Sequence, residues 1–145
     1  MGNHARRLLY GSRSNNLSPV FNIIFVGWVK LHREILEKAI WKCSTPEQKV
    51  VFMTIMMLAN HSEYQWIWQG KKFKCQPGQF ITSIKSLANH AMVSDQNVRT
   101  ALVKFEKLEF LTSESTNSGR LITICNWELY TTENYKTNHQ NYKYL

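Results

Sequence analysis

The chain lacks the sequence motifs that mark most enzymes and metal proteins. Its three cysteines are widely spaced and odd in number, which excludes a disulfide framework and a CxxC metal pattern and suits a reducing cytosol. It has no HExxH motif, no phosphate-binding glycine loop, no nucleophile elbow and no pair of carboxylates at a useful spacing. We therefore expect a cytoplasmic protein that is not an enzyme and that binds no metal and no cofactor.

Long hydrophobic runs are also missing. The apolar run at residues 20–26 is well short of the roughly 20 residues that a membrane span needs. Basic residues precede it, as in a signal peptide, but no small-residue cleavage site follows it. We expect no membrane partner, and we interpret residues 1–26 as a flexible N-terminal extension.

Acidic residues are scarce. The chain has 18 Lys and Arg against 10 Asp and Glu, which gives a net charge of +8 over 145 residues. From Lys71 to Lys107 there are seven basic residues against two acidic ones, Asp95 and Glu106. Such a basic excess favours a polyanionic partner, although composition alone leaves a merely soluble basic surface open.

The most informative stretch runs from Phe80 to Asn126 and predicts a helix, a tight turn, a second helix and a β-hairpin. Ser83 is placed to cap the first of these helices. The turn at residues 91–93 has the right length for a helix-turn-helix motif, although the usual glycine is missing. The second helix, Ser94–Leu108, begins at a good N-cap, and we predict it to be a recognition helix.

This helix has two contrasting faces. Apolar residues recur at helical spacing and predict the buried face, which comprises Val98, Ala101, Leu102, Phe105 and Leu108. The opposite face is rich in amide, hydroxyl and basic side chains, the types that contact base edges and phosphates. It carries Gln96, Arg99, Thr100, Val103 and Lys107, with Asn97 and Lys104 on its flank.

The hairpin after this helix is predicted to be a wing. Its strands are expected at Phe110–Glu114 and Leu121–Cys125, joined by a turn-rich loop at residues 115–120. The polar tip of the loop and Arg120 are placed to touch the sugar-phosphate backbone. A hairpin loop that makes no DNA contact is the alternative.

From this arrangement we predict a surface that binds double-stranded DNA. Gln96, Thr100 and Lys107 are expected to enter the major groove, and Arg99 and Lys104 to contact phosphates or a guanine edge. The full set of predicted DNA-binding residues is Lys85, Ser94, Gln96, Asn97, Arg99, Thr100, Lys104, Lys107, Asn117 and Arg120.

Two further helices are predicted ahead of this region. Gly27–Lys42 has apolar residues near one side and charged residues on the other, which predicts an amphipathic helix. Thr45 as N-cap, Pro46 at the first helical position and Gln48 completing a capping box predict a helix that ends near Asn60. Because that helix is apolar on nearly every side, we expect it to be the central buried helix.

The remaining segments predict short strands and a tail. Tyr64–Lys74 is β-rich, and we expect a loop there followed by a short strand around Lys72–Cys75. Another short strand is expected at Phe80–Thr82. Residues 131–145 are polar and lack apolar periodicity, which predicts a polar tail or the start of a linker. The predicted fold class is α+β, mainly α: a winged helix-turn-helix at residues 27–130 with an additional N-terminal helix and a small β-sheet or wing.

The order of these segments resembles a known family. GWVKLHREILEKAIW, an apolar helix ending in LANH, then PGQFITSIKSLA, VSDQNVRTALVKFEKLEFLTSESTN and LITICNWELY are similar to the N-terminal domain of phage replisome organizers. These are DnaD-like replication initiation proteins of phages of low-GC Gram-positive bacteria. The resemblance covers about residues 27–130, and the first 26 residues depart from it.

The resemblance implies a winged helix that binds the phage replication origin in the cytoplasm of the bacterial host cell. It also implies a separate C-terminal domain, so a host helicase loader is expected as a partner only if the full-length protein has that domain. One such domain buries only about 600–1,000 Å² on DNA, so self-association on repeated sites is also expected.

Two other functions fit the same fold. A winged-helix transcriptional regulator differs from an origin-binding protein in its target and not in its fold. A winged helix used only as a protein-interaction module is hinted at by apolar Val103 on the predicted DNA face.

Overall fold

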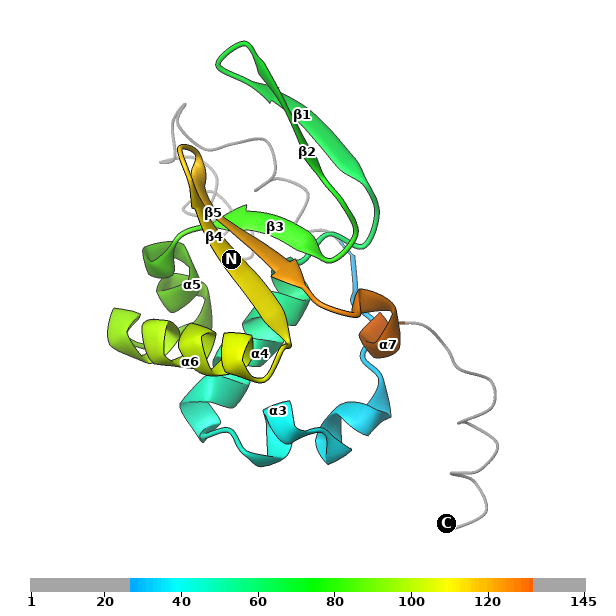
Figure 1. The fold of residues 1–145 in the computed structure, drawn as a ribbon, viewed down its shortest axis with the longest axis vertical. Helices are drawn as coiled ribbons and strands as arrows, with labels where there is room; N and C mark the ends of the chain where they lie inside the picture. Colours follow the sequence, from blue (N-terminus) through cyan, green and yellow to red (C-terminus); the bar gives the residue numbers. More distant parts are fainter. Residues whose placement is uncertain (1–26, 132–145) are drawn as a thin grey trace, which may run out of the picture.

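The computed structural model describes residues 27–131, which form a mixed α+β fold with two small antiparallel sheets (Figure 1). The predictions for residues 1–26 and for the tail after residue 131 lie outside the described residues. The elements follow in the order η1 (Arg33–Glu37), α3 (Ala39–Lys42), α4 (Pro46–Leu58), β1 (Tyr64–Trp68), β2 (Lys71–Cys75), β3 (Gln79–Thr82), α5 (Ile84–Ala91), α6 (Asp95–Lys107), β4 (Leu111–Thr116), β5 (Gly119–Ile124) and α7 (Trp127–Thr131).

Helix α4 forms the centre of the core. The predicted capping box is confirmed, because the Thr45 side chain accepts a hydrogen bond from the Gln48 amide and the Gln48 side chain accepts one from the Thr45 amide. The helix is not buried on every side, since Val50 and Met57 are about half exposed. Its remaining apolar side chains lie mostly in the core.

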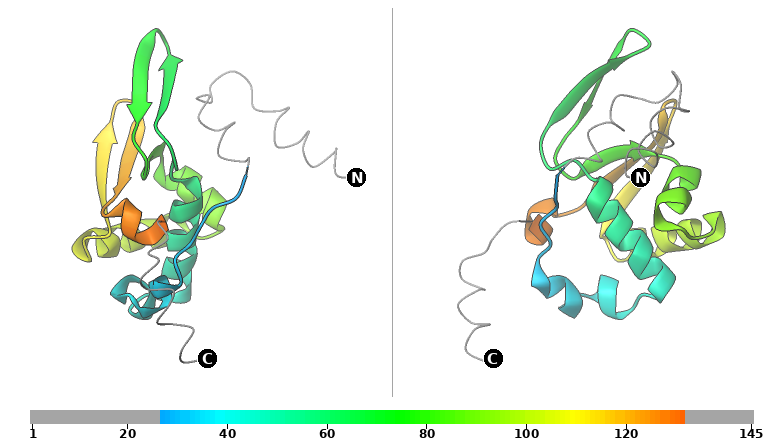
Figure 2. Two further views of the ribbon diagram at one scale, coloured as in Figure 1. Left: turned by 90° about the vertical axis from the view of Figure 1, so that its right-hand side faces the viewer. Right: turned by 180° about the vertical axis from the view of Figure 1, so that it is seen from behind.

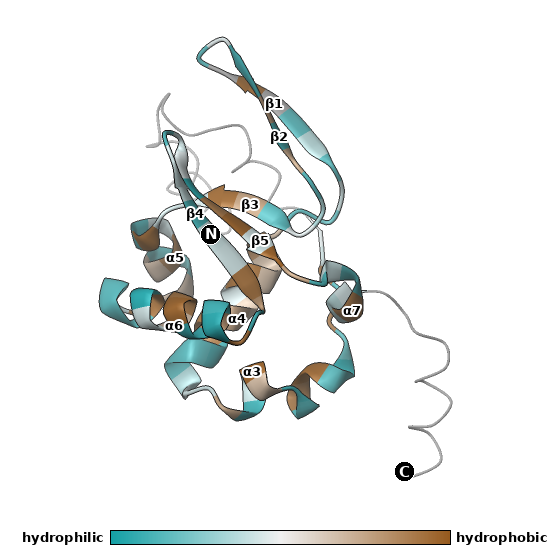
Figure 3. Ribbon diagram, viewed as in Figure 1, coloured by the Kyte–Doolittle hydropathy of each residue, from teal (hydrophilic) through white to brown (hydrophobic). Residues whose placement is uncertain are grey.

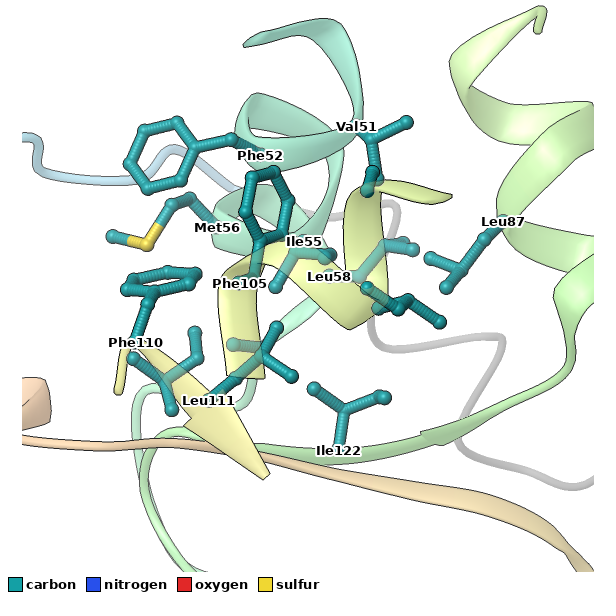
Figure 4. Packing of buried hydrophobic residues seen from close by; sticks show 14 of the residues in the cluster. Val51, Phe52, Ile55, Met56, Leu58, Leu87, Phe105, Phe110, Leu111 and Ile122 are labelled. Atoms are coloured by element: carbon teal, nitrogen blue, oxygen red, sulfur yellow. The ribbon is translucent and has the colours of Figure 1, made fainter. Parts of the chain in front are cut away.

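An aromatic cluster joins α4 to α6 and to the start of β4. The Phe52 ring lies 6.4 Å from that of Phe105 and 5.1 Å from that of Phe110, and the last two rings are 5.9 Å apart. Figure 4 shows these three rings close together beside Met56 and Leu111. Edge-to-face and tilted ring pairs of this kind add to the stabilisation from burial alone.

Helices α5 and α6 begin where the sequence predicts. Ser83 and Ser94 act as N-caps, because each hydroxyl accepts a hydrogen bond from the amide three residues later. The turn between the helices needs no glycine, since Met92 adopts the left-handed conformation itself, with φ 58°. Leu108 was predicted to be buried but is 37% exposed, because α6 ends at Lys107 and the chain turns away there.

The three-stranded sheet has the order β3-β5-β4, so β5 lies in the centre and pairs with both β3 and β4. Leu111 at the start of β4 and the alternate residues Ile122 and Ile124 of β5 are buried in the core. Figure 3 shows hydrophobic colour on much of β3 and β5 and hydrophilic colour on much of α6. Strands β4 and β5 each extend two residues farther toward their connecting turn than predicted, so only Asn117 and Ser118 connect them.

Residues 64–75 form a second hairpin: the strand predicted around Lys72–Cys75 is confirmed as β2, and β1 stands in place of the predicted loop. Strand β1 pairs with β2 over five residues, from Tyr64 opposite Cys75 to Trp68 opposite Lys71. The two connecting residues, Gln69 and Gly70, both have positive φ, 49° and 74°, as the tightest hairpin turns require. Figure 2 shows this hairpin standing out from the rest of the fold.

The predicted helix Gly27–Lys42 is wrong as a single helix. Residues 28–32 are not helical, η1 is a 3-10 turn, and Lys38 interrupts the helix with an extended conformation, ψ 150°. The buried residues of this segment, Ile35 and Ile40, explain the break. Residues five apart point about 140° away from each other on a continuous α-helix, so the interruption lets both reach the same core.

Candidate nucleic-acid interface

The outer face of α6 presents polar side chains in a fixed arrangement. Gln96, Thr100 and Lys107 are all exposed. The Thr100 hydroxyl donates to the backbone carbonyl of Gln96 at 2.9 Å, and the Gln96 Nε2 donates to the Thr100 Oγ1 at 3.4 Å. This pairing orders two side chains of the kind that read base edges before any partner arrives.

Positive charge on this face comes from Arg99 and Lys107. Both side chains are exposed, and neither forms an ion pair with a residue in the described part of the chain. Two cations without internal partners are available to an external anion such as a phosphate.

Lys104 makes hydrogen bonds within the protein. Its ammonium group donates to the backbone carbonyl of Cys43, at the end of α3, and to the Gln48 Oε1 of α4 at 3.0 Å. The side chain is only partly exposed. These contacts tie the C-terminal half of α6 to the start of α4, so Arg99 and Lys107 are better placed than Lys104 to meet DNA.

Three further predicted residues lie at the N-terminal ends of the two helices. Ser94 keeps its hydroxyl proton free to donate, since its oxygen accepts the capping bond from the Asn97 amide. The Asn97 side chain and Lys85, in the first turn of α5, are both exposed. Helix N-termini favour anions through their unpaired amides and dipole, so the start of each helix suits a phosphate group.

The hairpin of β4 and β5 places its two predicted residues differently. Asn117 lies in the turn and is exposed, as expected for a tip residue. Arg120 lies within β5 and not in a loop, and its guanidinium donates to the Ser113 Oγ at 2.8 Å. The guanidinium is therefore held along the hairpin, and the prediction that Arg120 belongs to the loop between the two strands is wrong.

Apolar side chains are also exposed near this face. Val103 on α6 is 52% exposed, and Met92 in the turn before α6 is 88% exposed. The face is therefore mixed in character, with a polar and cationic majority around an apolar spot.

Sequence reasoning did not assign two other exposed cations, Lys71 and Lys72. They were counted in the basic excess, and the strand predicted around Lys72–Cys75 is confirmed as β2, but its partner strand β1 was not predicted, so the position of both lysines next to a hairpin turn was missed. The Gln69-Gly70 pair between two β-rich runs was the signal that could have revealed this hairpin.

No group of three or more His, Cys, Asp or Glu side chains is placed to hold a metal ion among residues 27–131. No helix in the same part of the chain is long and apolar enough to cross a membrane. No protein-family model, no curated protein and no solved structure matches this chain.

Proposed function

We propose that this chain binds double-stranded DNA as a winged helix-turn-helix protein, with α6 as the recognition helix and the β4–β5 hairpin as the wing. The order of elements supports this fold. Helix α4, strand β3, helices α5 and α6, and the β4–β5 hairpin follow one another, and β3 closes the sheet beside β5. A helix pair followed by a hairpin in one small sheet is the arrangement of a winged helix.

The observation that carries the proposal is the division of α6 into two faces. Val98, Ala101, Leu102 and Phe105 are at most 4% exposed, so the core holds the helix firmly from one side. The other side exposes amide, hydroxyl and basic groups along a 13-residue helix. An α-helix with its side chains is about 10–12 Å wide and fits the roughly 12 Å major groove.

Each polar residue then has a role that its chemistry allows. Gln96 and Asn97 suit adenine edges, to which an amide group can make two hydrogen bonds. Arg99 and Lys107 suit phosphates or a guanine edge. Lys85 at the start of α5, Ser94 at the start of α6 and Asn117 of the wing would contact the DNA backbone.

The resemblance given above carries the proposal one step further, to the initiation of phage DNA replication. On that basis the duplex would be a replication origin in the host cytoplasm, bound by several copies at repeated sites. Recruitment of a host helicase loader would require a further domain in the full-length protein.

The test is a double charge reversal, Arg99→Glu with Lys107→Glu, measured by fluorescence anisotropy on fragments selected from the phage genome. We expect loss of salt-sensitive duplex binding with an unchanged circular-dichroism spectrum. The matched control is Lys30→Glu with Lys38→Glu, an equal charge change beside Trp28 and Tyr130. Equal binding by the α6 variant and the control would overturn the assignment of α6.

The sequences of the selected fragments separate origin binding from transcriptional regulation. Repeats within a replication gene support the first, and a promoter operator supports the second.

The exposed apolar spot favours one alternative function, a winged helix used only to bind another protein. Under that alternative, Val103→Ser would abolish complex formation with the partner, while the wild-type chain would show no salt-sensitive affinity for duplex DNA. Salt-sensitive affinity in the wild type would exclude it.

A further inference from the structure

The β1–β2 hairpin carries two exposed cations that nothing in the described structure neutralises. Lys71 and Lys72 are exposed and make no ion pair or hydrogen bond with the described residues. Their neighbour Lys74 differs, because its Nζ lies 3.1 Å from the Glu63 Oε1. The hairpin therefore has one lysine in an internal ion pair and two at its outer end that are available to an external anion.

The base of the hairpin is anchored. Cys75 is fully buried and is packed by partly buried apolar residues of β1, β2, β3 and β5, namely Tyr64, Phe73, Ile81 and Leu121. Lys71 lies four residues before Cys75 in β2, which corresponds to about 13 Å of strand. The two unpaired lysines are thus held well away from the body on an ordered two-stranded arm.

The arm points to the same end of the molecule as the wing. Figures 1 and 2 show, in three views, both hairpin turns projecting toward that end. Along the long axis, α6, the turn of the β4–β5 hairpin and the turn of the β1–β2 hairpin follow one another. A duplex that met α6 and continued past the wing would therefore approach Lys71 and Lys72.

We propose that the β1–β2 hairpin is a second DNA-contacting element, which grips phosphates of the duplex beyond the wing through Lys71 and Lys72. The proposal rests on the proposed function, since it extends the same duplex. Charge complementarity indicates the partner. Two ammonium groups that make no ion pair with the described residues, at the end of an exposed hairpin, suit a polyanion. The contact adds affinity without reading sequence, because phosphates are the same at every base pair.

The test compares the salt dependence of duplex binding between the full chain and its variant Lys71→Gln with Lys72→Gln. Each phosphate contact contributes about 0.9 to the slope of log affinity against log salt, so the slope should become shallower by about 2. Between 50 and 200 mM salt the wild type should then lose about tenfold more affinity than the variant. The matched control, Lys74→Gln, removes a lysine that is already paired and should leave the slope near its wild-type value.

A hydroxyl-radical footprint supplies the second measurement. The double variant should lose protection on one flank only, while the protection under α6 remains. Discrimination between specific and random duplex should be unchanged, since no base contact is removed.

The outcomes separate this proposal from the proposed function. An unchanged slope and footprint in the double variant would overturn the hairpin contact, even if Arg99→Glu with Lys107→Glu abolishes binding. A wild-type chain without salt-sensitive binding would overturn both. Altered sedimentation with an unchanged slope would also overturn it, and would assign the hairpin to contact between copies.

Discussion

The two hairpins of this protein are alike in local structure and opposite in their surroundings. Each has antiparallel strands of five or six residues joined by a two-residue connection. The β4–β5 hairpin pairs with a third strand and buries Leu111, Ile122 and Ile124 in the core. Among the side chains of the β1–β2 hairpin that the structure describes, Cys75 alone is buried, whereas Ile67 is 63% exposed.

This contrast shows that the turn residues determine the shape of a hairpin, whereas burial determines how strongly the hairpin is coupled to the rest of the fold. A two-residue turn and β-rich sequence are enough to specify a hairpin's shape. A hairpin becomes part of the cooperative fold only when its inward side chains have a core to enter. The following predictions test whether burial, and not strand pairing, sets the difference.

The largest expected effect comes from truncating matched isoleucines. Ile122→Ala removes a fully buried side chain and should lower the free energy of unfolding by about 2–5 kcal/mol, since it leaves a cavity. Ile67→Ala, in the exposed hairpin, should change it by less than about 0.5 kcal/mol. Urea denaturation followed by circular dichroism measures both. Equal losses would mean that the β1–β2 hairpin is as integral to the fold as the other.

The second contrast uses the glycines of the two hairpins. A Cβ at Gly119 would lie 2.8 Å from the Thr82 carbonyl oxygen, and φ there is +130°. Gly119→Ala should therefore cost about 3 kcal/mol or more, because backbone strain adds to a contact with backbone that cannot move aside. At Gly70 nothing lies within 4 Å, so Gly70→Ala should cost only the left-handed strain of about 1–2 kcal/mol. The shift in melting temperature provides the comparison, and a reversed order would contradict it.

Native-state hydrogen exchange should separate the hairpins without mutation. Amides of the β4–β5 hairpin should exchange only with global unfolding, whereas those of the β1–β2 hairpin should exchange through a cheaper local opening. Adding low concentrations of urea sharpens the test, because urea lowers global stability and only the first group should exchange faster in proportion to that loss. A single common opening energy for both would remove the contrast.

The caps and the faces of α6 could be read from the sequence because they depend on neighbouring residues. Ser83 and Ser94 each act on an amide three residues ahead, and Thr45 and Gln48 act on one another. Helical periodicity placed the buried residues of α6 except the last, since the helix stops one residue before it.

The features that sequence reasoning missed depend on distant partners. Lys104 meets Cys43, which is 61 residues away, and no local pattern encodes that contact. The break at Lys38 follows from the need of Ile35 and Ile40 to reach one core, which is a tertiary demand. The candidate site was therefore predictable in its composition, but not in which cations remain free.

The smallest expected effect concerns pH at the base of the β1–β2 hairpin. Partial burial, with the His61 ring 4.8 Å from that of Trp127, lowers the pKa of His61 below its ordinary 6.5. The unfolded chain then binds the proton more readily than the folded one, so stability should fall as pH drops below about 6.5 and stay level above it. His61→Asn should flatten this part of the profile. Urea midpoints at pH 7.5 and 5.5 measure the difference, and an identical profile in the variant would exclude His61 as its source.

The connection between the β1–β2 hairpin and the body has a consequence for how such a chain can change. The Gly78 amide donates to the Asn60 carbonyl at 2.7 Å, and the amide and side chain of Asn60 both donate to the Gln79 carbonyl, at 3.1 and 2.7 Å. The segment between Asn60 and Gly78 therefore leaves the rest of the fold and returns to it at one set of hydrogen bonds. It could be lengthened, shortened or exchanged while the rest of the fold keeps its shape, and it could be replaced with a short linker.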